Sequence, residues 1–260
     1  MKKGKLKRGR IGDNMFNFQF DRRIVMVIIG ILLLSAVVQF TANPGMLTSL
    51  LISAPAVLVA ITFHEFGHAF VADRLGDDTA RREGRLSLNP FSHLDPIGTL
   101  MLLVAGFGWG KPVHVDPRNY TRKMSMEKCE AIVSAAGPIL NIILAFIFAL
   151  IYCAVYKFGS IQFLSSTVGN VIMLILGAIV TTNIGLGVFN LIPLPPLHGS
   201  KIIMPFLPFN AKQWFISNGN IFYIIFVVIW ITGIAGIIIS PVISWITEGI
   251  LNLARMIFGI

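Results

Sequence analysis

The residues best suited to chemistry are two histidines and a glutamate in the pattern His-Glu-x-x-His, at residues 64–68. On an α-helix, His64 and His68 are one turn apart, offset by about 40° with a rise of about 6 Å, so both imidazoles face the same side. This spacing is typical of a zinc site in which the histidines hold the metal. Glu65 would take a proton from the attacking water and return it to the leaving amine. The alternative is a pair of hydrogen-bonded histidines that packs a helix interface.

A catalytic zinc usually has a third protein ligand, and His198 is the candidate in this sequence. It follows the run Phe-Asn-Leu-Ile-Pro-Leu-Pro-Pro-Leu at residues 189–197, where three prolines stand within four residues. Because proline has no backbone N–H and its ring obstructs a regular helix, we expect a membrane helix to end there. The chain after the break can then turn a side chain back toward the other helices.

The elements that must position these residues are membrane helices. Of the 260 residues, 55% are hydrophobic and 13% are charged, against about 25% charged residues in an average soluble domain. Apolar runs long enough to cross a hydrocarbon core predict spans at about 24–42, 47–72, 129–156, 167–192 and 214–240. The residues from Pro241 onward would lie in the interface or form a sixth, partly inserted helix. We therefore expect an all-α polytopic membrane protein with five to six transmembrane helices.

The net charge of +9 has a membrane explanation as well. Eight of the 21 Lys and Arg residues precede residue 24, and nine more lie between Arg74 and Lys128. Basic residues collect on the cytoplasmic flanks of membrane helices, so the lipid bilayer is an expected partner and nucleic acid is not. This distribution predicts a basic cytoplasmic tail at 1–23, a cytoplasmic N-terminus and cytoplasmic segments at 73–128 and 193–213. Residues 24–260 are expected to form a single membrane-embedded domain.

The segment at 73–128 is too polar to span but contains an apolar run from Ile97 to Phe107, followed by Trp109 among glycines. These features favour a small β-hairpin or a re-entrant loop that lies against the helices. Gly106 and Gly108 are candidates for binding an unwound substrate as an added strand, because glycines allow close backbone approach. The alternative is an interfacial anchor for Trp109.

These motifs together resemble the site-2 protease family of intramembrane zinc metalloproteases, in its short bacterial and archaeal type without a PDZ domain. The resemblance covers most of residues 50–205 through the runs HEFGH, GRLSLNP, GFGWGKPV, AGP with Asn141, and FNLIPLPPLHGSK. It implies a three-helix catalytic core at about 47–72, 129–156 and 167–192, within a domain core of about 47–205. It also implies one Zn²⁺ per chain and cleavage of transmembrane substrates near the cytoplasmic face of a bacterial or archaeal membrane.

One position departs from the family pattern. Where the family has Leu-Asp-Gly, with the aspartate as the third zinc ligand, this chain has Leu197-His198-Gly199. Three histidines and a water hold the catalytic zinc of carbonic anhydrase, so a histidine can fill this role. Three neutral ligands leave the site at +2 rather than +1, which lowers the pKa of a bound water and weakens it as a nucleophile. A zinc ligand, a disabling or engineered change, and a site held by two histidines all remain open.

Two amides on the predicted core helices are further candidates. Asn141 and Asn190 could bind a substrate backbone, or they could join helices through hydrogen bonds. Two functions rival the protease: a catalytically impaired relative that binds membrane partners, and an intramembrane metal transporter. A transporter would be expected to have ligands on several helices and often a histidine-rich loop, and this chain has five histidines in all. The substrate, any regulator and the oligomeric state are not encoded in a recognisable pattern.

Overall fold

The structure is a computed structural model that describes residues 30, 34, 38, 41–99, 110–121 and 124–260. The described residues are mostly helical and contain no β-strand. Among the described residues, four helices are long and apolar enough to cross a membrane: Leu47–Leu75, Met126–Phe158, Thr167–Leu191 and Ile234–Phe258. The helices Phe209–Ser217 and Gly219–Trp230 would together add a fifth span, bent by 65°. The prediction of an all-α polytopic membrane protein is confirmed, and the predicted first span at 24–42 lies mainly outside the described residues.

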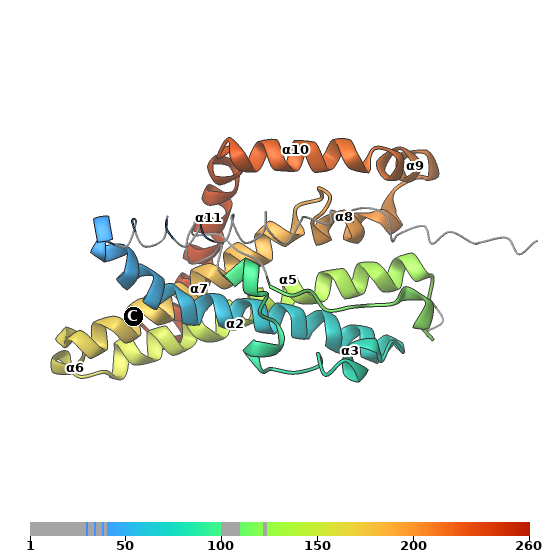
Figure 1. The fold of residues 1–260 in the computed structure, drawn as a ribbon. Coiled ribbons are helices and arrows are strands. Elements are labelled where there is room, and N and C mark those ends of the chain that lie inside the picture. The colour runs from blue at the N-terminus through green and yellow to red at the C-terminus, as the bar shows by residue number, and fades with distance from the viewer. Residues whose placement is uncertain (1–29, 31–33, 35–37, 39–40, 100–109, 122–123) are drawn as a thin grey trace, which may run out of the picture.

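Three helices form the core: α2 (Pro44–Leu75), α5 (Met126–Phe158) and α7 (Thr167–Leu191). Each of them packs against the other two (Figure 1). Ser125 and Ser166 cap the first turns of α5 and α7 by accepting hydrogen bonds from backbone N–H groups. The short helix α6 (Ile161–Ser165) joins α5 to α7 at one end of the bundle. The end of α2, the start of α5 and the end of α7 therefore meet at the opposite end of this three-helix core.

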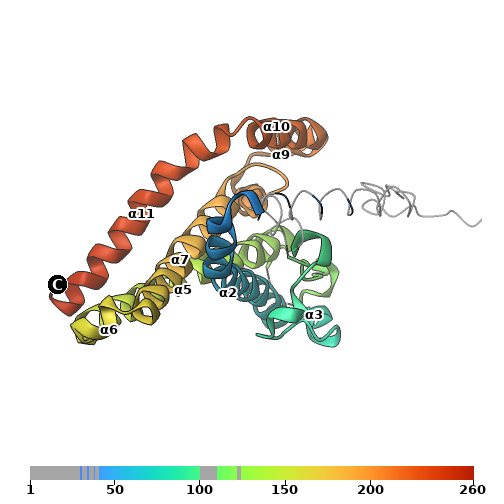
Figure 2. The same cartoon turned by 60° about the vertical axis from the view of Figure 1, so that its left-hand side comes forward.

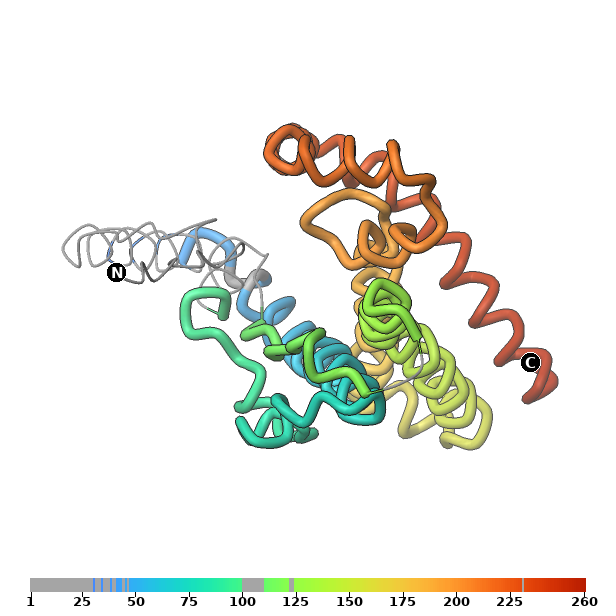
Figure 3. The backbone as a smooth tube through the Cα atoms, turned by 90° about the vertical axis from the view of Figure 1, so that its right-hand side faces the viewer, coloured from blue at the N-terminus to red at the C-terminus, as the bar shows by residue number. Residues whose placement is uncertain are grey.

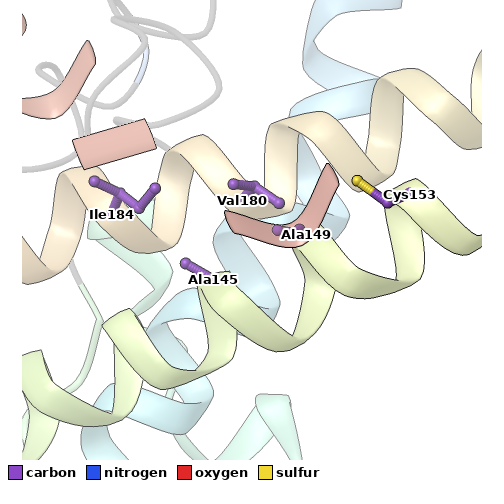
Figure 4. Close-up of a cluster of buried hydrophobic side chains, with 6 residues drawn as sticks. Ala145, Ala149, Cys153, Val180 and Ile184 are labelled. Carbon is purple, nitrogen blue, oxygen red and sulfur yellow. The ribbon is translucent and has the colours of Figure 1, made fainter. Parts of the chain in front are cut away.

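Small side chains let α5 and α7 approach closely. Ala145, Ala149 and Cys153 on α5 face Val180 and Ile184 on α7, and all five are almost completely buried (Figure 4). In a membrane, apolar lipid tails replace water, so helices associate through close van der Waals packing rather than through a hydrophobic effect between them. This stripe of small residues fixes the distance between the two helices.

The C-terminal region differs from the prediction of one span at 214–240. It consists of α9 (Phe209–Ser217), α10 (Gly219–Ile231) and α11 (Ile234–Phe258). Gly233 has a φ of 73°, a left-handed conformation that interrupts the apolar run before α11 begins. The tail after Pro241, expected in the interface or as a sixth helix, therefore belongs to one 25-residue helix that is long and apolar enough to cross a membrane. In Figure 2, α11 approaches the core near α6 and diverges from it toward α10.

Residues 76–99 and 110–121 lie beside α2, on the side away from α10 and α11 (Figure 3). They contain the short helices α3 (Thr79–Arg82), η1 (Pro90–Ser92) and η2 (Pro117–Asn119). An isolated antiparallel bridge joins Leu94 to Gly110. The predicted β-hairpin is not supported, since no strand flanks residues 100–109, and those residues are outside the described part of the chain.

A buried carboxylate holds this segment against the end of α2. Asp77 is 0% exposed, and its oxygens accept hydrogen bonds from Thr79, from the Asn119 amide and from the backbone N–H of Asp116. Burial opposes ionisation of Asp77, but these donors outweigh it and lower the pKa of the carboxyl below its usual value. The backbone at 116–119 is thereby fixed, and with it the stretch 112–115 that precedes it.

Candidate metal centre

His64 and His68 lie one turn apart on α2 and point into the interior of the three-helix core. They are 4% and 5% exposed, and their ring centroids are 4.6 Å apart. The helix thus brings both imidazoles to one place within a membrane-spanning segment, as their spacing predicts. Ionisable residues at that depth are costly unless they are paired or bind a ligand.

Each of these rings is oriented by a hydrogen bond from its Nδ1 atom. The Nδ1 of His64 lies 2.7 Å from Asn141 Oδ1, and the Nδ1 of His68 lies 2.7 Å from the carbonyl oxygen of Val133. Asn141 is itself fixed, because its Nδ2 donates to the Ala60 carbonyl at 3.0 Å and to Asn183 Oδ1 at 2.8 Å. Its Oδ1 must then face His64 as an acceptor. Both rings therefore carry their proton on Nδ1 and direct an Nε2 lone pair inward.

The two Nε2 atoms test whether this cluster fits a metal ion. They are 3.1 Å apart, and with both protons on Nδ1 neither Nε2 has a hydrogen to donate. Two lone pairs at this distance repel unless a cation lies between them. Zinc binds imidazole nitrogens at about 2.0–2.1 Å, so two of them at tetrahedral angles lie about 3.3 Å apart. The donor set and its spacing therefore fit zinc.

His198 joins the cluster from the segment that follows the end of α7. Its ring centroid lies 5.3 Å from that of His64 and 4.3 Å from that of His68. One nitrogen from each of the three rings falls within a set whose members are no more than 4.8 Å apart. Burial, with smaller contributions from His68 and Lys201, lowers the pKa of His198 to about 3. The imidazole is therefore neutral at pH 7 and offers a lone pair.

The position of His198 follows from how α7 ends. The helix stops at Leu191, ahead of the prolines at 193, 195 and 196, and a short helix α8 (His198–Ile203) begins at the histidine. Gly199 makes this turn possible, because a Cβ on it would lie 2.3 Å from the carbonyl oxygens of Leu191 and Ile192. Only a residue without a side chain lets α8 pack so closely on the end of α7.

A second glycine makes room for the imidazoles. A Cβ on Gly137 of α5 would lie 2.5 Å from His68 Nε2 and 2.9 Å from His64 Cε1. The glycine of the Ala-Gly-Pro run thus has a steric role at the cluster, which could not be predicted from the sequence. The backbone contact at Val133 has no sequence signal, because any residue type supplies a carbonyl.

Glu65 lies beside the three histidines. It lines a cavity of about 180 Å³ together with His68 and His198. Its Oε2 accepts a hydrogen bond of 2.8 Å from the backbone N–H of Val113, in the segment that Asp77 fixes. One carboxylate oxygen is thus held in place, and the other has no hydrogen bond among the described residues.

The predicted substrate-binding residues have different surroundings. Asn141 is 0% exposed, and both its amide hydrogens are donated to oxygens of α2 and α7, which favours the helix-joining alternative. Asn190 is 9% exposed and donates to the Leu186 carbonyl within its own helix. Gly106 and Gly108 lie outside the described residues.

Comparison with known proteins places this geometry in a family. The chain is 36% identical over 202 residues to a Bacillus subtilis protein named "Putative zinc metalloprotease YwhC". The aligned region is 78% of this chain and 90% of that protein. It is 32% identical over 170 residues to "Putative zinc metalloprotease Rip2" of Mycolicibacterium smegmatis, 60% of each chain. The chain belongs to the site-2 protease family. No family model and no solved structure matches it.

Membership explains the two histidines of α2 and the carboxylate between them, and it confirms the resemblance read from the motifs. The names of the relatives indicate a zinc protease, and the apolar helices make the chain an integral membrane protein. The third position of the site-2 protease pattern still carries a histidine, and the fold delivers its ring to the cluster at the place where an aspartate would be expected.

Proposed function

We propose that this protein is an intramembrane zinc endopeptidase that hydrolyses peptide bonds in or near transmembrane segments of other membrane proteins. The observation that carries the proposal is the convergence of Glu65, His68 and His198 on one cavity, with His64 beside them. The three imidazoles would hold one zinc ion, and a bound zinc would supply a Lewis acid that polarises a peptide carbonyl and acidifies a water molecule. The protein's own residues would carry out the remaining steps.

Glu65 is the proposed general base. The Val113 N–H holds one of its oxygens, so the carboxylate cannot swing away from the cavity. The other oxygen would accept a proton from the attacking water and pass it to the leaving nitrogen as the C–N bond breaks. Water adds OH to the carbonyl carbon and H to the nitrogen, so the products are a carboxyl and an amine terminus.

The substrate would reach this cavity as an unwound stretch of a transmembrane helix. Part of the cavity lining is formed by Pro112, Val113, Val115 and Pro117. Such a lining suits an extended peptide better than an intact helix, whose amides are occupied by internal hydrogen bonds. We further propose that the site lies near the cytoplasmic face, as the distribution of basic residues predicts.

The experiment compares wild type with Glu65→Gln in cells that express the full chain. Wild type should create new peptide termini at the ends of transmembrane segments in the membrane proteome, and Glu65→Gln should lower their formation by about 100-fold or more. The purified variant should retain zinc, because the histidines are untouched. Glu83→Gln is the matched control, since Glu83 pairs with the exposed His114 and does not line the cavity.

Equal cleavage by wild type and Glu65→Gln would overturn the role of Glu65. Zinc-loaded wild type that produces no new termini would instead support the alternative of an impaired family member that binds membrane partners.

A further inference from the structure

Lys201 shares a helix face with His198. The two residues are three positions apart on α8, which corresponds to an angular offset of about 60° and a rise of about 4.5 Å. Lys201 lines the same cavity as Glu65, His68 and His198. A lysine side chain is long and flexible, so its ammonium can reach the space between these groups.

The Lys201 ammonium has no hydrogen bond or ion pair with any described residue. Two other described lysines do have partners: Lys212 pairs with Glu127 at 2.5 Å, and Lys157 donates to the Phe258 carbonyl. Lys111 and Lys128 have none, but neither of them lines this cavity. An ammonium carries three donors, and those of this exposed, cavity-lining lysine are not used by the fold of the described chain.

Lys201 brings a positive charge to a cavity that Glu65 and Glu130 also line. Lys201 is close enough for its charge to act on both His68 and His198. Its positive charge opposes the binding of a cation by the three neutral imidazoles, none of which carries a negative charge to offset it. A positive charge at this place would become favourable once negative charge develops in the cavity, and peptide hydrolysis generates such charge on the carbonyl oxygen.

We propose that Lys201 is a catalytic residue that donates a hydrogen bond to the carbonyl oxygen of the peptide bond being cleaved. This inference rests on the proposed protease function. When the water oxygen bonds to the carbonyl carbon, the π electrons of the C=O bond move to its oxygen, and the ammonium stabilises the resulting negative charge. The water proton goes to Glu65 and then to the nitrogen as the C–N bond breaks, which restores the C=O bond. Lys201 keeps its own protons throughout.

The test uses full-length protein in proteoliposomes, with the transmembrane substrate whose cleavage depends most strongly on Glu65 in cells. Lys201→Met keeps the length of the side chain and removes its charge, whereas Lys201→Arg keeps the charge. Lys128→Met is the matched control, because Lys128 is exposed at the start of α5 and does not line the cavity. The quantities measured are kcat, KM and the zinc affinity from competition with a chelator.

We expect Lys201→Met to lower kcat at least tenfold with little change in KM, because the interaction is made with charge that exists only in the transition state. Lys201→Arg should keep kcat within about threefold of wild type, and Lys128→Met should match wild type. Zinc should bind Lys201→Met as tightly as wild type or more tightly, since a repulsive charge has been removed.

Three results would overturn the role of Lys201: an unchanged kcat in Lys201→Met, a change confined to KM, or a loss of zinc. If wild type and Lys201→Met cleave the substrate equally well, the role of Lys201 is refuted and the proposed protease function stands. A wild type that cleaves nothing removes the proposed function and this inference together.

Discussion

At the level of single residues, position 198 sets the charge of the site. A neutral imidazole here leaves a bound zinc ion with its full charge of +2, whereas the family's aspartate would reduce it to +1. The ring lies 4.3 Å from His68 between centroids, so the fold places it close enough to complete the cluster. Its low pKa keeps it unprotonated at neutral pH, which a ligand requires.

His198→Ala is expected to lower zinc affinity and proteolysis together, because a two-histidine site holds the ion with one ligand fewer. His198→Asp should still bind zinc, and cleavage should persist or rise if the surroundings accept a carboxylate. Zinc affinity is measured by chelator competition, and cleavage by the appearance of new termini.

If His198→Ala kept the zinc affinity and turnover of wild type, position 198 would not be a ligand. If wild type showed no cleavage and His198→Asp did, the histidine would be a disabling substitution.

At the level of helices, the site depends on a hydrogen-bonded link through all three core helices. Asn141 on α5 connects His64 and Ala60 on α2 to Asn183 on α7, and Asn183 in turn donates to the Ile179 carbonyl of its own helix. Asn141 and Asn183 are both 0% exposed. Such a network sets the rotation of α5 relative to α2, and it also sets the tautomer of a proposed ligand.

Asn141→Ala should therefore weaken zinc binding by about 10–100-fold, since His64 loses the partner that orients its ring. Unpairing the Ala60 carbonyl should also cost about 1–3 kcal/mol of stability. Asn190→Ala is the control, because Asn190 bonds only within its own helix in the described structure. The measurements are chelator competition and thermal unfolding in detergent, and equal zinc affinity in both variants would argue against the orienting role.

At the level of the whole molecule, the two ends of the bundle differ in charge and in structure. The end with the three histidines carries Arg74, Arg81, Arg82 and Arg85 together with residues 110–121. The opposite end, formed by α6 and the C-terminus of α11, carries Lys157 and Arg255. We propose that the first end is cytoplasmic and that residues 24–260 form one membrane-embedded domain after a basic tail at 1–23.

Thiol labelling can test this orientation. Both native cysteines are buried, so wild type serves as the blank for a membrane-impermeant maleimide. Arg82→Cys should react only after the membrane is permeabilised, because that side chain is exposed at the proposed cytoplasmic end. Ile161→Cys should react in intact cells, since Ile161 is 87% exposed at the other end. The reverse labelling pattern would place the three histidines near the outer face of the membrane.

The sequence alone predicts the class of protein, the core helices and the family. These features depend on local properties: apolar run length, the one-turn spacing of His64 and His68, and prolines that end a helix. The same local rules failed between residues 214 and 240, where a long apolar run predicts one span. There the left-handed backbone at Gly233 divides the chain, and hydropathy is insensitive to backbone conformation.

The sequence names His198 as a candidate ligand, but only the tertiary structure decided that its ring reaches the cluster and which groups surround it. It brings His198 to the two histidines of α2, which are more than a hundred residues away in sequence. It also supplies contacts from backbone atoms at Val113 and Val133, which cannot be predicted from residue type. It also assigns Asn141 to the orientation of His64 and leaves Lys201 without a partner in the described chain. These outcomes depend on how helices distant in sequence rotate and pack against one another, and no local pattern in the sequence contains that information.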